Sequence, residues 1–189
     1  MYKKEDLRIV KTKRNLYEGL LFMMKEKPFE EIKVSDICKE ALTNRSTFYD
    51  HFNDKYELLV SLIEDLKYEL TEKLKENKNI ETPKQYYMEM IHLLLDHIEE
   101  NSKVYSSIIK YNSNTIASDM FKQTLLKDVA KQIESFDTCK KNIPAEIITL
   151  FYVSAVINVC MDYIRSQKKY RKEEILTYLD TLIPDTIYE

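Results

Sequence analysis

Thr43-Asn44-Arg45-Ser46-Thr47-Phe48-Tyr49-Asp50-His51-Phe52 decides the fold, together with the preceding Val34-Ser35-Asp36-Ile37-Cys38-Lys39-Glu40-Ala41. Each segment is long enough for about two to three helical turns, and only Leu42-Thr43-Asn44 lies between them. A helix, a short turn and a second helix are the layout of a DNA-reading motif. An ordinary pair of solvated helices is the alternative, and these residues alone leave both interpretations open.

The second helix separates its apolar and polar side chains. Phe48 and Phe52 are four residues apart, so they share one helical face and should point inward. The outward face then carries Ser46, Thr47, Tyr49 and Asp50, with Arg45 and His51 beside it. Such a face suits a major groove, because Thr47 can meet a thymine methyl, Arg45 can donate to guanine and Tyr49 can reach a phosphate.

The neighbouring segments add further candidate contacts. Ser35 is expected to cap the first helix, with Asp36 in its first turn, where a carboxylate suits the helix dipole. Lys55 stands in the first turn of the next helix, where its charge opposes the dipole unless a DNA phosphate lies against that end. The residues predicted to bind DNA are Ser35, Thr43, Asn44, Arg45, Ser46, Thr47, Tyr49, Asp50, His51 and Lys55.

The order of motifs around this stretch resembles the N-terminal domain of the TetR/AcrR family of bacterial one-component repressors. The matching motifs are Lys27-Pro28-Phe29, Ile32-x-Val34-x-Asp36-Ile37, Thr47-Phe48-Tyr49-x-His51-Phe52 and Asp54-Lys55-x-x-Leu58-Leu59. The resemblance covers roughly residues 8 to 65 and implies a dimeric DNA-binding regulator with a helical sensor domain. Two residues depart from the pattern. Leu42 stands where the family usually has glycine, so the turn must avoid a positive φ or bear strain. Asp50 repels phosphate unless it accepts from a cytosine amino group.

Charge is distributed in the direction expected for a DNA-reading head on an acidic body. The 189 residues contain 29 Lys and Arg against 32 Asp and Glu, a net charge of −3. Residues 1–55 hold 12 basic and 10 acidic residues, a charge of +2, which leaves 17 basic and 22 acidic residues, or −5, in the remainder. The asymmetry has the right sign for DNA binding but is too small to establish it.

Helical periodicity continues to the end of the chain, so we expect an all-α protein with a DNA-binding domain at 1–53 and a helical regulatory and dimerisation domain at 54–189. The further helices are expected at about 54–76, 82–100, 103–110, 115–136, 144–167 and 171–183. Thr82 with Pro83 is a typical helix start. The stretch from Ile147 to Ile164 is apolar nearly all round, yet its polar residues favour a buried helix over a membrane span.

The sequence gives little support for a redox, metal-binding or phosphate-binding site. Cys38, Cys139 and Cys160 are interpreted as buried free thiols in a reducing cytoplasm. Glu89, His92 and Asp96 could form half of a metal site on one helical face, but a hydrogen-bonded cluster is the better interpretation. One glycine cannot build a phosphate-binding loop. We therefore expect no enzyme activity, no cofactor and no membrane partner.

These observations predict a sequence-specific, ligand-responsive repressor that binds a palindromic operator in the cytoplasm as a homodimer. The helices at 144–167 and 171–183 would form the dimer contact, including Val156 and Val159, and the tyrosine-rich and methionine-rich body could hold a small-molecule inducer. The alternative is a helical protein-interaction module whose head no longer reads DNA.

Overall fold

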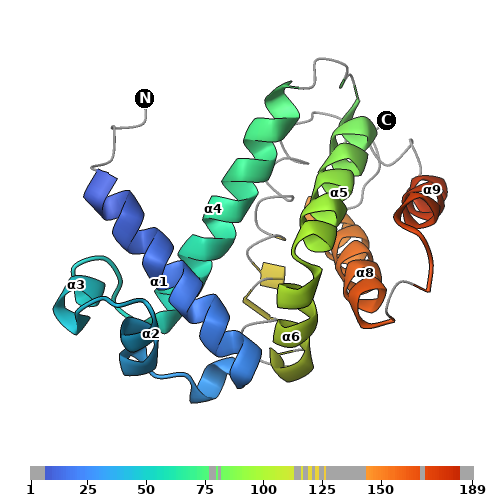
Figure 1. The fold of residues 1–189 in the computed structure, drawn as a ribbon. Helices are drawn as coiled ribbons and strands as arrows, with labels where there is room; N and C mark the ends of the chain where they lie inside the picture. The colour runs from blue at the N-terminus through green and yellow to red at the C-terminus, as the bar shows by residue number, and fades with distance from the viewer. Residues whose placement is uncertain are drawn as a thin grey trace. The chain divides into compact units, whose positions relative to one another are not determined.

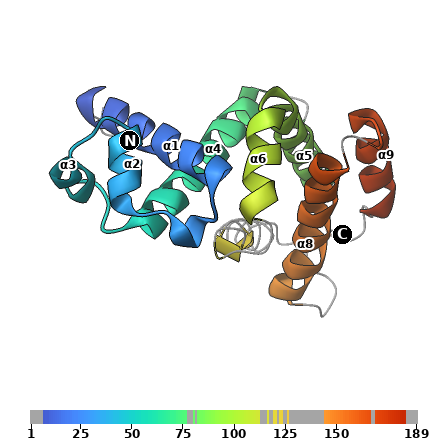
Figure 2. The same cartoon turned by 60° about the horizontal axis from the view of Figure 1, so that its bottom comes forward.

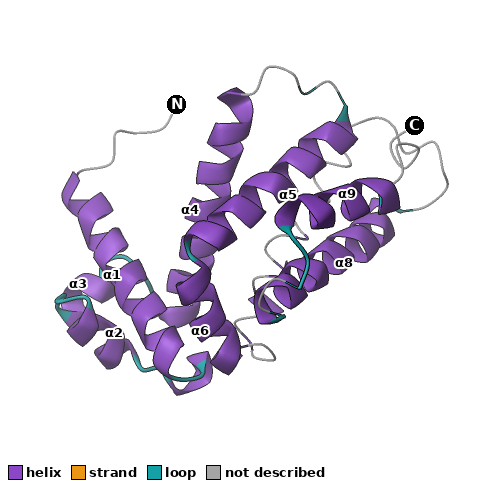
Figure 3. Cartoon of the chain, turned by 45° about the vertical axis from the view of Figure 1, so that its right-hand side comes forward, coloured by secondary structure: helices purple, strands orange, loops and turns teal. Residues whose placement is uncertain are grey.

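The computed structural model describes residues 7–76, 80, 82–112, 116, 119–120, 122–123, 126, 144–166 and 169–183. Within these ranges the chain consists of helices and loops without a strand, as Figure 3 shows, which confirms the all-α prediction. The elements are α1 (Leu7–Glu26), the 3-10 turn η1 (Phe29–Glu31), α2 (Val34–Glu40), α3 (Arg45–Tyr49), α4 (Lys55–Glu76), α5 (Pro83–Glu100), α6 (Ser102–Asn112), α8 (Ala145–Arg165) and α9 (Lys172–Leu182).

The chain folds into two compact units. The first unit consists of Met1–Asp65 and Ser107–Met120, and the second consists of Leu66–Ser106 and Phe121–Glu189. Helices α4 and α6 each begin in one unit and end in the other. This division of the backbone differs from the predicted domains at 1–53 and 54–189, which concern function and stay a prediction.

Helices α1, α2, α3 and the start of α4 lie together in the first unit (Figure 1, Figure 2). They bury a common set of apolar side chains. Leu16, Ile37, Phe48 and Leu58 are fully buried, and Phe52 is 4 % exposed, so the predicted inward face of Phe48 and Phe52 is confirmed. The Tyr17 hydroxyl donates to Asp65 at 2.8 Å and lies 2.8 Å from the Ser61 hydroxyl. These bonds join α1 to α4.

Gly19, the only glycine of the chain, lies where α1 crosses α2. A Cβ at this position would lie 2.9 Å from the carbonyl oxygen of Ile37 and 3.1 Å from both the nitrogen and the Cβ of Ala41. Two of these atoms are backbone and cannot move aside without shifting α2. The close approach of α1 and α2 therefore requires glycine.

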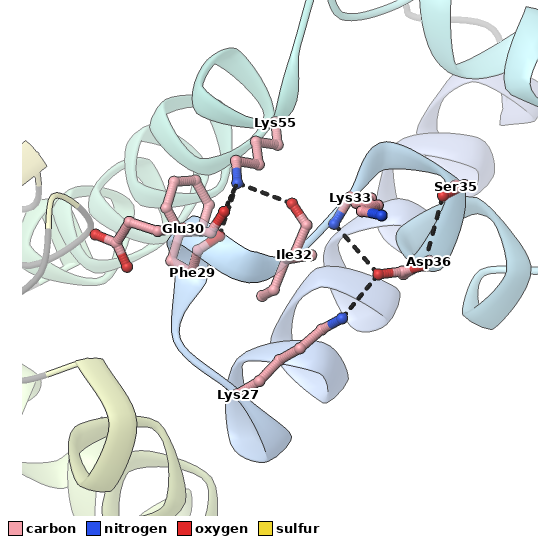
Figure 4. Close-up of polar contacts among 8 residues, drawn as sticks. All are labelled: Lys27, Phe29, Glu30, Ile32, Lys33, Ser35, Asp36 and Lys55. Carbon is pink, nitrogen blue, oxygen red and sulfur yellow. Dashed lines mark hydrogen bonds and ion pairs between the residues drawn. The ribbon is translucent and has the colours of Figure 1, made fainter.

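The segment between α1 and α2, residues 27–33, is held by a single lysine of α4 (Figure 4). Lys55 Nζ donates to the carbonyl oxygens of Phe29, Glu30 and Ile32 at 2.8, 2.9 and 2.8 Å. The same ammonium lies 4.8 Å from the centre of the Phe29 ring. The 3-10 turn η1 is too short to pair all of its carbonyl oxygens internally, and each oxygen can accept more than one hydrogen bond, so Lys55 supplies the further donors.

A buried asparagine at the end of α6 fixes the other side of this segment. Asn112 is 4 % exposed. Its Oδ1 accepts from Phe29 N at 2.8 Å, and its Nδ2 donates to the carbonyl oxygens of Met24 and Ile108 at 3.0 Å each. A buried amide with its groups paired in this way costs little free energy and fixes the chain path closely.

The turn between α2 and α3 closes in a Schellman arrangement. Thr43 N donates to the Cys38 carbonyl at 2.9 Å, and Leu42 N donates to the Lys39 carbonyl at 3.3 Å. This arrangement places the residue after the C-cap in the left-handed region, where glycine is preferred. Leu42 occupies that position with φ 50°. A turn without glycine was expected either to avoid a positive φ or to bear strain, and the structure shows the strained, positive φ.

The second unit has its core between α5, α8 and α9, which the views in Figure 1 and Figure 3 place side by side. Its buried members are Ile91, Leu95, Ile98, Cys160, Tyr163, Ile175, Leu179 and Ile183. Thr82 caps α5 by accepting from Gln85 N at 3.2 Å, and proline follows in the first turn, as predicted. The Tyr163 hydroxyl donates to Glu99 at 2.5 Å and joins α8 to α5.

Helix α8 is less buried than its composition predicts. Its stretch Glu146–Arg165 is long and apolar enough to cross a membrane by length and composition, with a mean hydropathy of 1.8, yet only 28 % of that apolar window is buried. Within the single chain, one face of α8 therefore has no covering element among the described residues, and burial of that face against a partner stays a prediction. The helix expected at 115–136 lies largely outside the described residues, and the loop with Cys139 lies wholly outside them.

Replacing Lys55 by methionine should destabilise the first unit. Lys55→Met keeps the aliphatic stem and removes the ammonium from three carbonyls, which should lower the free energy of unfolding by about 2 kcal/mol. Urea unfolding followed by circular dichroism measures the change. Lys73→Met is the matched control, because Lys73 pairs only with the exposed Glu69 of the same helix in the described contacts, and it should change stability by less than about 0.5 kcal/mol. Equal effects of the two variants would contradict the role of Lys55.

Replacing Leu42 by glycine should stabilise the protein. The Leu42 side chain is 94 % exposed, so its removal loses no packing, while glycine adopts φ 50° without strain. The expected gain is about 1 kcal/mol after the greater freedom of the unfolded chain is included. Glu40→Gly, two residues earlier in regular helix, should destabilise instead. A Leu42→Gly protein that melts at or below the parental temperature would argue against strain at this turn.

Candidate nucleic-acid interface

The predicted DNA contacts gather on α3 and the turns at its two ends, a surface that we call the recognition surface and define as the outward residues of 42–51. Asn44, Arg45, Ser46 and Asp50 are exposed, and Tyr49 is 50 % exposed. Thr43, Thr47 and His51 are half-buried. Phe48 backs this surface from the core, and its ring lies 5.3 Å from that of Tyr49, edge to face. The recognition surface is therefore polar outside and anchored by aromatic packing inside.

Helix α3 is shorter than the sequence predicts. It contains five residues and ends at Tyr49, with Asp50 as the C-cap and His51 in the following turn. The prediction of a helix reaching His51 was wrong, because the regular helix ends at Tyr49. A helical hydrogen bond continues beyond it, from Phe52 N to the Phe48 carbonyl at 2.9 Å, and this bond keeps both rings on the inward side. Asp50 and His51 consequently lie beside the helix end, and their predicted contacts with DNA stay predictions.

Helix α2 begins one residue before the predicted cap. Val34 is its first residue and Lys33 its N-cap, so the expectation of Ser35 as the cap was wrong. Asp36 performs part of the capping instead, because its Oδ2 accepts from Lys33 N at 3.3 Å and from Lys27 Nζ at 2.8 Å (Figure 4). The Lys27 hydrogen bond, with the one from Lys33, holds the pKa of Asp36 below its usual value. Ser35 is exposed and points its hydroxyl at Asp36 Oδ1, 3.4 Å away.

Lys55 is engaged within the protein. Its three ammonium hydrogens match the three carbonyl acceptors described above, and an ammonium has no further donor for a phosphate. This geometry counts against the predicted phosphate contact of Lys55. Burial lowers the pKa of the Lys55 ammonium, and the neighbouring Glu30 carboxylate opposes that effect.

Leu42 is a candidate contact that the sequence argument missed. Its side chain stands 94 % exposed at the start of the recognition surface. An apolar group next to polar base-reading residues can meet a thymine methyl in the major groove. The signal in the sequence is a leucine at a turn position where glycine is expected, because such a leucine is both strained and exposed.

The other residues considered as candidate sites are a cysteine and a cluster on α5. Cys38 is 4 % exposed, and burial raises the pKa of its thiol. On α5, His92 lies 3.8 Å from Glu89 and 3.5 Å from Asp96, and Asp96 also bonds Lys172. In the part of the chain that the structure describes, no three His, Cys, Asp or Glu residues gather as metal ligands would.

Two family models match the chain. The model of bacterial regulatory proteins of the tetR family matches residues 21–62, and the model of a transcriptional regulator C-terminal region matches residues 87–185. The first covers η1, α2, α3 and the beginning of α4, and the second covers most of α5 and all of α6, α8 and α9.

A curated relative supports the first match. The uncharacterized HTH-type transcriptional regulator YxbF of Bacillus subtilis (strain 168) is 38 % identical over 63 residues, which is 33 % of this chain and 17 % of that protein. The chain thus spans less than a fifth of the length of this relative.

Solved structures match nearly the whole chain. A TetR transcriptional regulator from Streptococcus agalactiae 2603V is 26 % identical with a TM-score of 0.63, covering 98 % of both chains. A putative TetR-family transcriptional regulator from Syntrophomonas wolfei str. Goettingen shares the fold at 20 % identity and a TM-score of 0.64, covering 90 % of this chain and 92 % of its own. Helix-turn-helix geometry, family models and solved structures agree, and the chain belongs to the TetR family of transcriptional regulators.

Proposed function

We propose that this protein is a ligand-responsive repressor that binds a palindromic operator as a homodimer, with α3 in the major groove. The observation that carries the proposal is the recognition surface, where exposed polar side chains of α3 stand on a buried aromatic base. Arg45 is suited to guanine, because its guanidinium can donate to both acceptors on the major-groove edge. Tyr49 is suited to a phosphate, which would position the helix without reading sequence.

The second unit offers a surface for a second copy of the chain. On α8, Ile147 is 53 %, Leu150 52 % and Phe151 68 % exposed, and on α9 Leu182 is 70 % exposed. Apolar side chains in such numbers on two helices favour burial against a symmetric partner, which would complete a four-helix bundle. The contact would centre on Phe151. Val156 and Val159, the residues first expected in it, pack against the core of their own unit.

Repression would be relieved by a small molecule that favours one arrangement of the two heads. A ligand shifts such an equilibrium only by its difference in affinity for the two arrangements. Helices α4 and α6 offer a route for this coupling, because each runs from one unit into the other. Since the operator lies on chromosomal DNA, we place the protein in the cytoplasm.

A protein-interaction module is the second candidate function. Its support is the exposed Asp50 beside α3, which repels phosphate, and the charge of only +2 over residues 1–55. Under this alternative the recognition surface would bind a protein and would show no preference among DNA sequences.

Two substitutions on α3 separate base reading from phosphate contact. Arg45→Ala should weaken operator binding by about 1–3 kcal/mol and relax the preference at one base position. Tyr49→Phe should weaken binding to all sequences alike, because it loses a hydroxyl that carries no sequence information. Fluorescence anisotropy with the DNA upstream of the chain's own gene, followed by a set of single-base variants, measures both effects. Folded variants that bind like the parent would rule out α3 as the reader.

Charge on the exposed face of α8 should break the dimer. Phe151→Glu combined with Ile147→Glu should give a helical monomer with reduced operator affinity, because one short recognition helix makes too few contacts alone. Sedimentation velocity reports the oligomeric state. Phe22→Glu on α1 is the control, since Phe22 is an exposed aromatic residue of the first unit, and this variant should stay dimeric. A dimeric double variant, or a monomer with full operator affinity, would contradict the proposal.

A further inference from the structure

A groove runs between α5 and α9 in the second unit. Its volume is about 480 Å³, which is within the range of small-molecule sites. Met88, Glu89 and His92 of α5 line one side, and Leu176 and Asp180 of α9 line the other. Both walls belong to one compact unit and share its apolar core.

Part of the groove lining is apolar. Met88 and Leu176 are half-buried and pack against the core of the second unit, and Ile80 is half-buried next to them in the lining. Methionine adapts its shape to a ligand, because its unbranched side chain has several accessible rotamers. This part of the groove suits a hydrocarbon body.

Of the three carboxylates in or next to the groove, one has no lysine or arginine partner in the described contacts. Asp180 pairs with Lys84 at 3.3 Å, and the Lys84 side chain is 15 % exposed. Asp96 pairs with Lys172. Glu89 has only the His92 imidazole as its ion-pair partner among the described residues, and the 3.8 Å between them is too long for a hydrogen bond. The Glu89 side chain is 33 % exposed, so a ligand can reach it.

We propose that this groove binds an organic cation, with its ammonium group at Glu89 and its apolar body against Met88, Leu176 and Ile80. A cation supplies the positive counter-charge that Glu89 lacks in the described contacts, whereas an anion would be repelled by the Glu89 carboxylate. A neutral molecule would gain only the apolar contact. The site names a chemical class of ligand for the second unit and stands independently of DNA binding by the first.

Three probes with one hydrocarbon body test the requirement for positive charge. They are 4-phenylbutylammonium, 4-phenylbutanol and 4-phenylbutyrate, titrated into the full-length protein by calorimetry. We expect the ammonium to bind on the order of tenfold more tightly than the alcohol, and the carboxylate to bind more weakly than either. The probe should also shift the signal of the Met88 methyl group in a protein labelled with ¹³C-methyl methionine, where Met88→Leu assigns that signal among the seven methionines.

Two matched variants, each of which removes one carboxylate charge from α5, test whether Glu89 binds the ammonium group. Glu89→Gln should reduce ammonium affinity on the order of tenfold and leave alcohol affinity unchanged. Glu100→Gln makes the same charge change on the exposed end of the same helix, about 16 Å along its axis, and should leave both affinities unchanged.

The proposal is overturned if no probe binds, if the three probes bind equally, if the Met88 methyl signal stays unmoved, or if Glu89→Gln binds the ammonium like the parent. An equal loss in Glu89→Gln and Glu100→Gln would also overturn it, because the effect would then come from net charge. None of these measurements includes DNA, so their failure leaves the proposed repressor function to its own tests.

Discussion

Three backbone carbonyls that converge on one ammonium group set the position of the recognition surface. The carbonyls of Phe29, Glu30 and Ile32 all accept from Lys55, the first residue of α4. Helix α2 starts directly after this passage at Val34, and α3 follows α2 through the Schellman turn. Because each element begins where the previous one is fixed, the Lys55 contacts determine where α3 is presented.

The only glycine of the chain, Gly19, lies at a helix contact, whereas the turn between α2 and α3 has leucine at the position that favours glycine. Gly19 permits α1 and α2 to approach so closely that a Cβ would collide with the backbone of α2. Leu42 instead bears a left-handed conformation in a turn that glycine would adopt freely. This strained turn leaves an exposed apolar side chain at the edge of the recognition surface, beside Thr43.

Local sequence patterns predicted those structural features that depend on residues close together in the chain. The spacing of Phe48 and Phe52 predicted the inward face of α3 and its surroundings, and Thr82 with Pro83 predicted the start of α5. Asp54 caps α4 in the same local way, by accepting from the amides of Tyr56 and Glu57 at 2.8 and 2.9 Å.

Local patterns could not predict contacts between residues that lie far apart in the sequence. Lys55 was judged by the helix dipole alone, since nothing local shows that residues 29–32 turn their carbonyls toward it. Asn112 forms hydrogen bonds with the backbone of Met24 and Phe29, more than 80 residues earlier. The hydrophobic periodicity of the sequence cannot predict such a contact. The composition of α8 predicted apolar burial, but only the packing of α5 and α9 reveals that Val156 faces the core while Phe151 faces outward.

The salt dependence of DNA binding tests the central claim most directly, because it reports phosphate contacts without any knowledge of the operator. The parent protein is titrated onto the DNA upstream of its own gene at several salt concentrations, with a scrambled sequence of equal length as the control. Each phosphate contact contributes about −0.9 to the slope of log affinity against log salt, so a dimer with two heads on DNA predicts a slope of about −4 or steeper. It also predicts tighter binding to the upstream DNA than to the scrambled sequence. A slope near zero, or equal affinity for both sequences, would contradict the account.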